Sequence, residues 1–545
     1  MTCHRFVFFN LKLHIKKRRQ AAALQMPALI IHGHFYQPPR ENPWTGIIER
    51  QPSAAPFHDW NERIHLECYK PNAFVELSDR TINNYANISF NFGPTLLSWL
   101  EQNHQETYRR IIEADRDSAL KRNGHGNAIA QAYGHAILPL CNERDLRTQI
   151  RWGLADFRYR FSREAEAMWL PETACNDEVM DALIEEGLRF VILAPNQAAR
   201  VRAAVSTDRG AEVNTGSDSD RVDDWLEVTE QTIDPSIPYI RFHRDGSNRS
   251  IAVFFYDGPT SRAIAFEKLL TSSSQFVNRL ALAATGREMI NVATDGETYG
   301  HHFKFGDLCL AHALSEEAAA REFLITNYAA YLDEHPPAFE VEINNGADGE
   351  GTSWSCVHGV GRWIRNCGCE TGGERGWNQE WRTPLRQALD FLRDENSAYF
   401  DATRGKLFTY PWLARDESVA LILDDHASRE EFVFHHAGRW LTADEQHRAL
   451  TYLELQRMLL LMYTSCGWFF NDISGIETIQ ILRYAGRAID LMDQLGLPSA
   501  LERFLEILSA AKSNRSELGT GADIYRTFVA SPGVAVVSQD VALAK

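Results

Sequence analysis

Acidic and imidazole side chains come directly after a short apolar run near the middle of the chain. Residues 289–293 have the length and β-branched content of a buried strand, and Asp295, Glu297, His301 and His302 follow them. Burying such groups costs free energy unless they have partners or a chemical role. Their position at a strand end is typical of an active site, and a hydrogen-bonded turn is the alternative interpretation.

A second carboxyl group that could take part in catalysis ends the segment Trp169-Leu-Pro-Glu172. Glycoside hydrolysis uses two carboxyl groups that face each other across one bond, one attacking or stabilising the sugar and the other donating a proton. Glu172 and Asp295 are far apart in the sequence, so only the fold can bring them together. A glutamate after a proline is otherwise an ordinary solvated turn residue.

Histidines occupy comparable positions, because His32, His34 and His135 also follow apolar segments. Converging imidazoles beside a carboxylate could hold a metal ion. They could equally donate hydrogen bonds to sugar hydroxyls and to a nucleophile. The spacing leaves both roles open, and the site that we predict contains no metal and no cofactor.

Three cysteines and a histidine lie close together in one Gly-rich segment: Cys356, His358, Cys367 and Cys369. The Cys-Gly-Cys unit cannot close a relaxed disulfide with itself. Three thiols and an imidazole are a ligand set for zinc, but the spacing matches no zinc-finger pattern. The sequence does not decide between a metal site and a loop that folds as a lid.

Seven short apolar runs alternate with helical segments and would position these side chains. They cover residues 29–31, 88–92, 126–133, 165–169, 189–194, 251–256 and 289–293. This alternation predicts an α/β fold with a parallel sheet, open or closed. Polar residues follow each run: His32, His34, Asn91, Gln131, His135, Glu172, Asn196, Asp257 and Asp295. Parallel strands end on one face, so we expect these residues to meet there.

The rest of the chain divides by composition into further regions. Residues 26–343 form the predicted catalytic unit, 203–222 a flexible insertion, 344–382 a Gly- and Trp-rich loop, 383–513 a helical domain and 514–545 a tail. In the loop, Trp354 and Trp363 could be platforms for sugar rings or could pin the loop to its neighbours. Residues 1–25 have a basic run after an apolar one, the reverse of a secretory signal, and we predict an ill-ordered extension.

The overall composition excludes several classes of function. A net charge of −17 disfavours nucleic acid and anionic membrane surfaces as partners. The 9 cysteines are an odd, scattered set, which indicates a reducing cytoplasm rather than a disulfide framework. No apolar run reaches the ~20 residues of a membrane helix. Phosphate-loop, dinucleotide and Gly-x-Ser-x-Gly motifs are missing.

Three motifs together resemble glycoside hydrolase family 57. They are His32-Gly-His34 with Gln37-Pro38, Trp169-Leu-Pro-Glu172, and Asp295-Gly-Glu297 with Gly300. The resemblance covers roughly residues 27–480. It implies an incomplete seven-stranded β/α barrel followed by a helical domain, and a retaining hydrolase or glycosyltransferring enzyme that acts on α-glucans.

The same resemblance assigns roles to individual residues. Glu172 is the implied nucleophile that forms a covalent glycosyl-enzyme, and Asp295 is the implied acid/base, which then needs a raised pKa from burial or from the Glu172 charge. The predicted substrate-binding residues are His32, His34, Gln37, His135, Trp169, Asp257, Glu297, His301, His302, Trp354, Trp363, Trp468 and Asp472.

The chain departs from the family pattern in two places, which leaves the linkage, the chain length and the exact activity open. Phe35 and Tyr36 are inserted before Gln37, and the segment 126–131 lacks the glutamate that family members often carry. Two other functions stay in view. One is a metal-dependent polysaccharide deacetylase on a similar barrel. The other is a non-catalytic glucan-binding protein. The predicted partner in each case is an oligo- or polysaccharide, and the oligomeric state is open.

Overall fold

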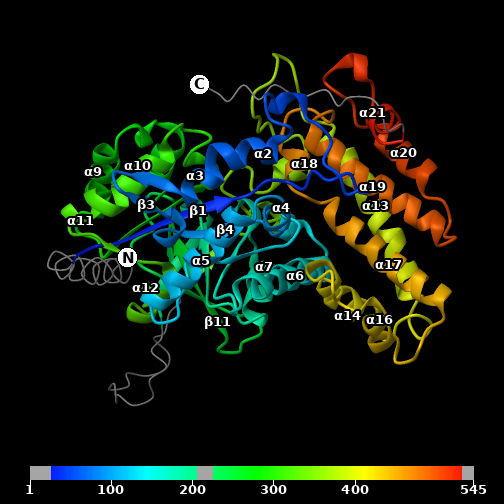
Figure 1. The fold of residues 1–545 in the computed structure, drawn as a ribbon, viewed down its shortest axis with the longest axis horizontal. Helices are drawn as coiled ribbons and strands as arrows, with labels where there is room; N and C mark the ends of the chain where they lie inside the picture. The colour runs from blue at the N-terminus through cyan, green and yellow to red at the C-terminus, as the bar shows by residue number, and fades with distance from the viewer. Residues whose placement is uncertain (1–25, 205–224, 531–545) are drawn as a thin grey trace, which may run out of the picture.

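The computed structural model describes residues 26–204 and 225–530. The predicted extension 1–25, most of the predicted insertion and the last residues of the predicted tail lie outside these ranges. The chain has an α/β part followed by a helical part, which lie side by side (Figure 1).

Each of the seven apolar runs overlaps a strand. These strands are β1 (Ala28–Phe35), β4 (Ser89–Phe92), β5 (Ala130–Gln131), β6 (Met168–Trp169), β7 (Phe190–Leu193), β11 (Ser250–Phe255) and β12 (Met289–Asp295). Every residue in β1, β4 and β7 is buried, which explains the continuous apolar sequence of β7 and of the first half of β1.

Parallel pairing connects these strands along most of their order. β1 pairs with β12 on one edge, and with β4 and the short β13 (Leu324–Ile325) on the other. β5 pairs with β6, β7 pairs with β11, and single parallel bridges link β4 to residue 128 and β6 to β7. Between β11 and β12 the connection is a hydrogen bond from the Asp257 amide to the Asn291 carbonyl, 2.8 Å long. The pairing itself therefore does not establish the closed arrangement of a barrel.

Further strands extend the sheet on the side of β11. They are β8 (Ala198–Ala203), β9 (Leu226–Glu227), β10 (Tyr239–Phe242) and β14 (Phe339–Ile343), in the order β7-β11-β10-β14-β8-β9. None of these strands was predicted from the sequence. They are short and half-buried, with antiparallel partners that only tertiary structure supplies. A two-stranded hairpin, β2 (Val75–Leu77) and β3 (Arg80–Ile82), lies apart from this sheet.

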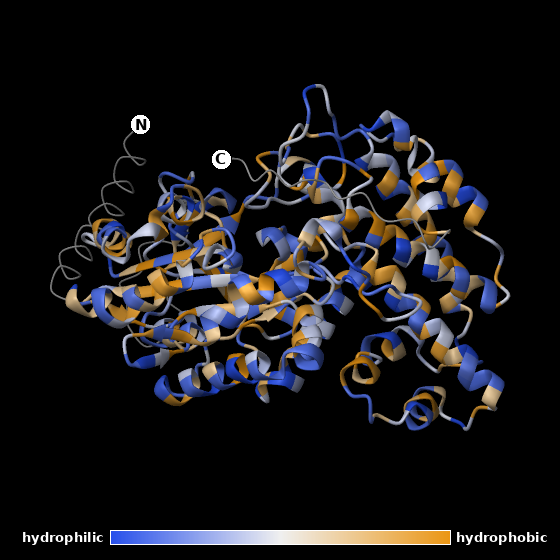
Figure 2. Cartoon of the chain, turned by 45° about the horizontal axis from the view of Figure 1, so that its top comes forward, coloured by the Kyte–Doolittle hydropathy of each residue, from blue (hydrophilic) through white to orange (hydrophobic). Residues whose placement is uncertain are grey.

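Helices connect and cover the strands of the α/β part. They are α2 (Trp60–Ile64), α3 (Lys70–Ala73), α4 (Pro94–Asn103), α5 (Gln105–Lys121), α6 (Glu143–Phe161), α7 (Asp177–Glu185), α8 (Gly258–Phe266), α9 (Ser273–Ala284), α10 (Gly306–His312), α11 (Ala318–Ala320) and α12 (Tyr328–Glu334). Asn142 shows how the sequence starts one of them, because its side chain accepts from the Asp145 amide at the N-terminus of α6. Apolar residues mark the central strands, and polar residues mark the outer turns of the helices (Figure 2).

The helical part begins after the Gly- and Trp-rich loop. It contains α13 (Arg382–Asp401), α14 (Pro411–Glu417), α15 (Ala420–Leu423), α16 (Arg429–Ala437), α17 (Ala443–Leu461), α18 (Cys466–Phe469), α19 (Ile476–Gln494), α20 (Leu501–Leu508) and α21 (Gly521–Phe528). Helix α21 corrects the prediction that a tail starts at residue 514. A capping box at Thr520 starts this helix, and Ile524 and Phe528 bury its apolar face in the core of the helical part. In the described ranges, no helix combines the length and the apolar composition needed to cross a bilayer.

Candidate active site

Glu172 lies in a strained turn directly after β6. Its φ and ψ are 59° and 21°, and the next residue, Thr173, also has a positive φ of 50°. Residues other than glycine adopt this left-handed backbone conformation at a cost of roughly 1–3 kcal/mol, and such residues gather at functional sites. The surrounding structure therefore holds the Glu172 carboxylate in one chosen direction.

Two uncharged donors hold the Glu172 carboxylate. Its Oε2 accepts from the indole Nε1 of Trp354 at 3.0 Å and from the hydroxyl of Ser355 at 2.6 Å. Burial raises the pKa of Glu172, and the bonds from Ser355 and Trp354 and the charge of Arg362 oppose that rise. Sequence reasoning singled out Trp354 but missed Ser355, because a serine in a Gly-rich loop carries no signal of its own.

Asp295 is the last residue of β12, where it pairs in register with His34 of β1. Its side chain reaches solvent, although protein surrounds it closely enough to raise the pKa to about 7 through burial and, second, through the charge of Glu172. A general acid at this position would need a pKa raised in this direction. The coupling between the two carboxyl groups also shows that the fold brings them close together.

A chain of neutral hydrogen bonds runs through the histidines beside the carboxylates. Asn91 Nδ2 lies 2.9 Å from His34 Nδ1, His34 Nε2 lies 3.2 Å from His135 Nε2, and His135 Nδ1 lies 2.7 Å from the Ser465 hydroxyl. Donors and acceptors match along this chain if His34 carries its proton on Nε2 and His135 carries its proton on Nδ1. Burial lowers the pKa of His34 well below its usual value and that of His135 to about 3, so both rings are neutral.

Aromatic rings form one wall of the site. The Trp169 ring stacks on His32 at 4.8 Å and on His34 at 5.1 Å, and its edge faces Trp354 at 5.1 Å. His32 is fully buried, and its ring supports Trp169 by stacking on it. Burial lowers the pKa of His32 to about 3. The inserted Tyr36 stacks on His135 at 3.7 Å.

Glu297 anchors this wall. The buried carboxylate accepts from the Tyr69 hydroxyl at 2.5 Å and from the Tyr36 amide at 3.1 Å, and burial raises its pKa to about 8. Its Oε1 accepts both bonds and thus connects the turn after β12 to the loop after β1. The structure assigns Glu297 to the support of Tyr36.

The remaining predicted residues near this face have a mixture of partners. His301 Nδ1 lies 2.5 Å from a Glu67 carboxylate oxygen. His302 is exposed, and its surroundings and His301 lower its pKa to about 4. The Gln37 side-chain oxygen accepts from Arg40 at 2.8 Å.

Asp257 does not offer its carboxylate to the site. One oxygen accepts from the Thr260 amide as the N-cap of α8, and the other accepts from Arg287 at 2.8 Å. This corrects the expectation that Asp257 binds substrate. A carboxylate after a strand is also the preferred first residue of the following helix, and the sequence does not distinguish the two roles.

The predicted residues from the later part of the chain, Trp354 apart, belong to cores. Asp472 is fully buried and accepts from the Ser474 amide and hydroxyl and from the Asn514 amide. Trp468 and Trp363 are buried members of the core of the helical part, and the Trp363 Nε1 donates to a backbone carbonyl. The aromatic and acidic signal that suggested substrate contacts is explained by packing and by turn formation.

Metal-ligating side chains converge at two places in the part of the chain that the structure describes. One group is Glu62, His65 and His104, and the other is Cys356, His358, Cys367 and Cys369. The strand-end histidines and Asp295 belong to neither group. His32 and His34 instead both form hydrogen bonds with the Asn91 side chain.

Residues 28–344 match the model of the family described as "Glycosyl hydrolase family 57". That match covers more than half of the chain. The chain belongs to glycosyl hydrolase family 57. This confirms the resemblance drawn from the three motifs. Residues 377–544 match a second model, "Domain of unknown function (DUF3536)", which covers the helical part from α13 to α21.

Two curated relatives share sequence with this family 57 protein over part of its length. "Alpha-amylase 1" of Dictyoglomus thermophilum is 29% identical over 152 residues, which are 27% of this chain and 20% of that protein. "Alpha-amylase" of Pyrococcus horikoshii is 27% identical over 157 residues, 28% of this chain and 23% of that protein. This chain thus spans between a fifth and a quarter of the amylases that it matches.

Solved structures resemble the whole fold. An exo-type maltose-forming amylase from Pyrococcus sp. ST04 has a TM-score of 0.63 at 16% identity, with 88% of this chain and 82% of that chain covered. A GH57-type branching enzyme from Pyrococcus horikoshii has a TM-score of 0.51 at 14% identity, with 92% and 94% covered. At these identities the similarity shows the shared α/β fold with its helical C-terminal part.

Proposed function

We propose that this protein is a retaining glycoside hydrolase or glycosyltransferring enzyme that acts on α-glucans, built on an incomplete seven-stranded β/α barrel. The observation that carries the proposal is the difference between two neighbouring carboxyl groups. Glu172 is held by the Trp354 and Ser355 donors, which favour its charged form, whereas Asp295 has its pKa raised to about 7. Membership of family 57, and curated relatives named as amylases, support the substrate class.

The two carboxyl groups would divide the reaction between them. The Glu172 carboxylate attacks the anomeric carbon while Asp295 transfers its proton to the leaving oxygen, which gives a covalent glycosyl-enzyme. Bond formation removes the negative charge of Glu172. Because that charge is one cause of the raised Asp295 pKa, Asp295 becomes a stronger acid and stays ionised. It then accepts the proton of a water molecule or an acceptor hydroxyl as that group attacks.

Hydrolysis and transfer share every step up to the glycosyl-enzyme. The attacking group alone separates them, and it depends on how well the occupied site excludes water. Trp354 and Tyr36 are suited to contact the apolar faces of sugar rings beside the carboxylates. The neutral His34–His135 pair, whose ring nitrogens already bond to each other and to Asn91 and Ser465, would hold the stacked rings of Trp169 and Tyr36 in place.

The test is product analysis on maltooligosaccharides and glycogen. We expect the wild type to shorten or redistribute chains, and Glu172→Gln and Asp295→Asn to lose this activity. Asp257→Asn is the matched control, because it also alters a carboxyl group that follows a strand, but one with structural partners. It should stay active. An inert wild type, or active Glu172→Gln and Asp295→Asn variants, would refute the proposal.

A second measurement addresses the covalent step. A maltosyl fluoride needs no acid for departure of its leaving group, so Asp295→Asn should still be glycosylated by it but should turn over slowly. Mass spectrometry of peptides should then find the added sugar on Glu172. A label on any other residue would contradict the assignment of the nucleophile.

A further inference from the structure

We infer that Cys356, His358, Cys367 and Cys369 bind one zinc ion, which fixes the loop that carries the two donors to Glu172. The four ligand atoms all lie within 4.8 Å of one another. The four ligands take no part in the proposed chemistry, and the occupancy of this site does not depend on the proposed function.

The distances between the ligand atoms match a tetrahedral ion. The sulfurs of Cys356 and Cys367 are 3.9 Å apart, and those of Cys356 and Cys369 are 3.7 Å apart. Zn–S bonds of about 2.3 Å at tetrahedral angles place two sulfurs about 3.8 Å apart. The Cys369 sulfur lies 3.5 Å from His358 Nδ1. A Zn–S and a Zn–N bond of about 2.0–2.1 Å place these atoms about 3.5 Å apart.

The backbone of the loop allows this convergence. Gly368 separates two of the ligands and has a φ of +83°, which turns the chain so that both thiols face one side. Gly361 lies so close to Cys367 that an added Cβ would be 3.1 Å from the Cys367 Cβ. The tertiary structure thus gathers ligands whose spacing matches no zinc-finger pattern.

The charge around the cluster suits a bound zinc ion. Zn²⁺ with three thiolates and a neutral imidazole carries a net charge of about −1. Two buried guanidinium groups lie beside it: Arg382 donates to the Cys369 carbonyl at 3.4 Å, and Arg362 donates to the Ser355 carbonyl at 3.1 Å. A disulfide between Cys356 and Cys367 would use only two of the four ligands and would remove two of the thiolates that offset these positive charges.

The cluster is directly connected to the donors of the site. Cys356 follows Trp354 and Ser355 in the chain, and both of these side chains bind Glu172. The Ser353 hydroxyl donates to the Gly359 carbonyl, inside the segment that the ion would close. Zinc would therefore hold the donor pair in place as a positioning element.

The experiment is metal analysis of the full chain purified without chelator. We expect about one zinc per chain, replaceable by Co²⁺ with the absorption of thiolate-bound tetrahedral cobalt. Cys367→Ser, Cys369→Ser and His358→Ala should each bind at least fivefold less zinc. Cys141→Ser is the matched control, because Cys141 is partly exposed and lies outside the cluster, and it should keep the metal.

Two further measurements keep the inference open to refutation if a cysteine variant misfolds. His358→Cys should retain zinc, since a thiolate replaces the imidazole of an exposed residue. Removal of the metal from wild type should speed hydrogen exchange of backbone amides 353–369 more than tenfold, while α19 amides stay unchanged. A wild type that binds no zinc when it is supplied, a native Cys356–Cys367 disulfide, or His358→Ala and Cys369→Ser variants with full zinc content would overturn it.

Discussion

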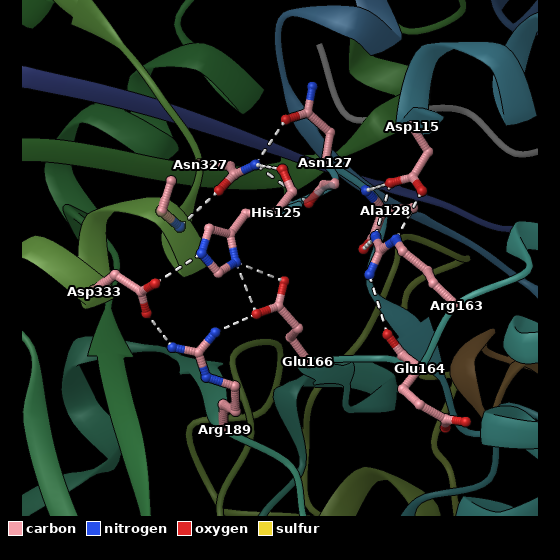
Figure 3. A network of polar contacts seen from close by, with 12 residues as sticks. Asp115, His125, Asn127, Ala128, Arg163, Glu164, Glu166, Arg189, Asn327 and Asp333 are labelled. Atoms are coloured by element: carbon pink, nitrogen blue, oxygen red, sulfur yellow. Dashed lines mark hydrogen bonds and ion pairs between the residues drawn. The ribbon is translucent and has the colours of Figure 1, made fainter. Parts of the chain in front are cut away.

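The two ends of the parallel strands carry the same kinds of side chain. Partners of opposite charge neutralise the carboxylates at the amino ends but not those at the carboxyl ends. At the amino ends, His125 lies 2.9 Å from a Glu166 oxygen and 2.8 Å from an Asp333 oxygen, and Arg189 pairs with both carboxylates (Figure 3). Glu166 and Asp333 each face two nitrogen groups that can carry a positive charge, those of His125 and Arg189. Bonds from Arg189 and His125 lower the pKa of Asp333.

A second ion pair stabilises the same end. Arg163 forms two bonds with Asp115, 2.9 and 2.8 Å long, and donates to the Ala128 carbonyl just before β5 (Figure 3). Asp115 also accepts from the Ala128 amide at 2.8 Å. These contacts fix a helix and the start of a strand to each other.

At the carboxyl ends, Glu172 and Asp295 have no such neutralisation. Within the described residues, neither of them forms an ion pair. Glu172 accepts from an indole and a hydroxyl, and the charge of Arg362 acts on it without direct contact, while the like charge of Glu172 helps burial to raise the pKa of Asp295. Paired carboxylates add stability, whereas unpaired ones keep pKa values that suit proton transfer. Residue type alone therefore does not separate structural acids from reactive ones.

Asp295→Asn should have the largest effect and should separate activity from stability. Loss of a general acid lowers kcat by about 10²–10⁴-fold. A carboxyl group whose folded-state pKa is raised binds more protons folded than unfolded, so it reduces stability as pH rises from about 4 to about 7. The denaturant concentration at the midpoint of unfolding should therefore rise in the variant, relative to wild type, between about pH 4.5 and about pH 8. If the difference in unfolding midpoint between the variant and wild type does not grow with pH, Asp295 has an ordinary pKa.

Arg163→Met should have the opposite pattern. Arg163 is partly exposed but Asp115 is buried, so removing Arg163 leaves an unpaired buried charge and costs up to about 3–5 kcal/mol. Arg158→Met is the matched control, since its pair with Glu164 is exposed on both sides and is expected to contribute at most about 1 kcal/mol. Urea unfolding measures both changes. The pH profile of kcat/KM should keep its shape in both variants, and a shifted profile in Arg163→Met would show that the two ends are coupled.

Ser355→Ala should have the smallest effect and should act on one limb of the pH profile. A hydrogen bond to a charged group contributes about 1.5–3 kcal/mol, so kcat/KM should fall roughly 10–100-fold. Without this donor the pKa of Glu172 rises further, and the acidic limb should move to higher pH. Ser353→Ala alters a serine of the same loop that donates to a carbonyl, and it should leave that limb in place. An equal shift in both variants would assign the effect to loop disorder.

Local sequence patterns predicted the strands well but predicted side-chain roles unevenly. Strands β1, β7, β11 and β12 lie within or around the predicted runs because buried parallel strands need continuous apolar residues. Asp257 and Asp472 looked like site residues because caps and turns use the same carboxylate that catalysis uses. Helix α21 escaped prediction because its eight residues carry too short a pattern.

The sequence by itself determined where strands end and which acids and imidazoles follow them, because apolar runs and turn residues are local properties of the chain. The tertiary structure alone decided which of those acids are neutralised and which keep a raised pKa. Ser355 reaches Glu172 from 183 residues away, and Glu172 raises the pKa of Asp295 from a different strand. Burial and charge act through space, so the partners that set a pKa are not written next to the residue that titrates.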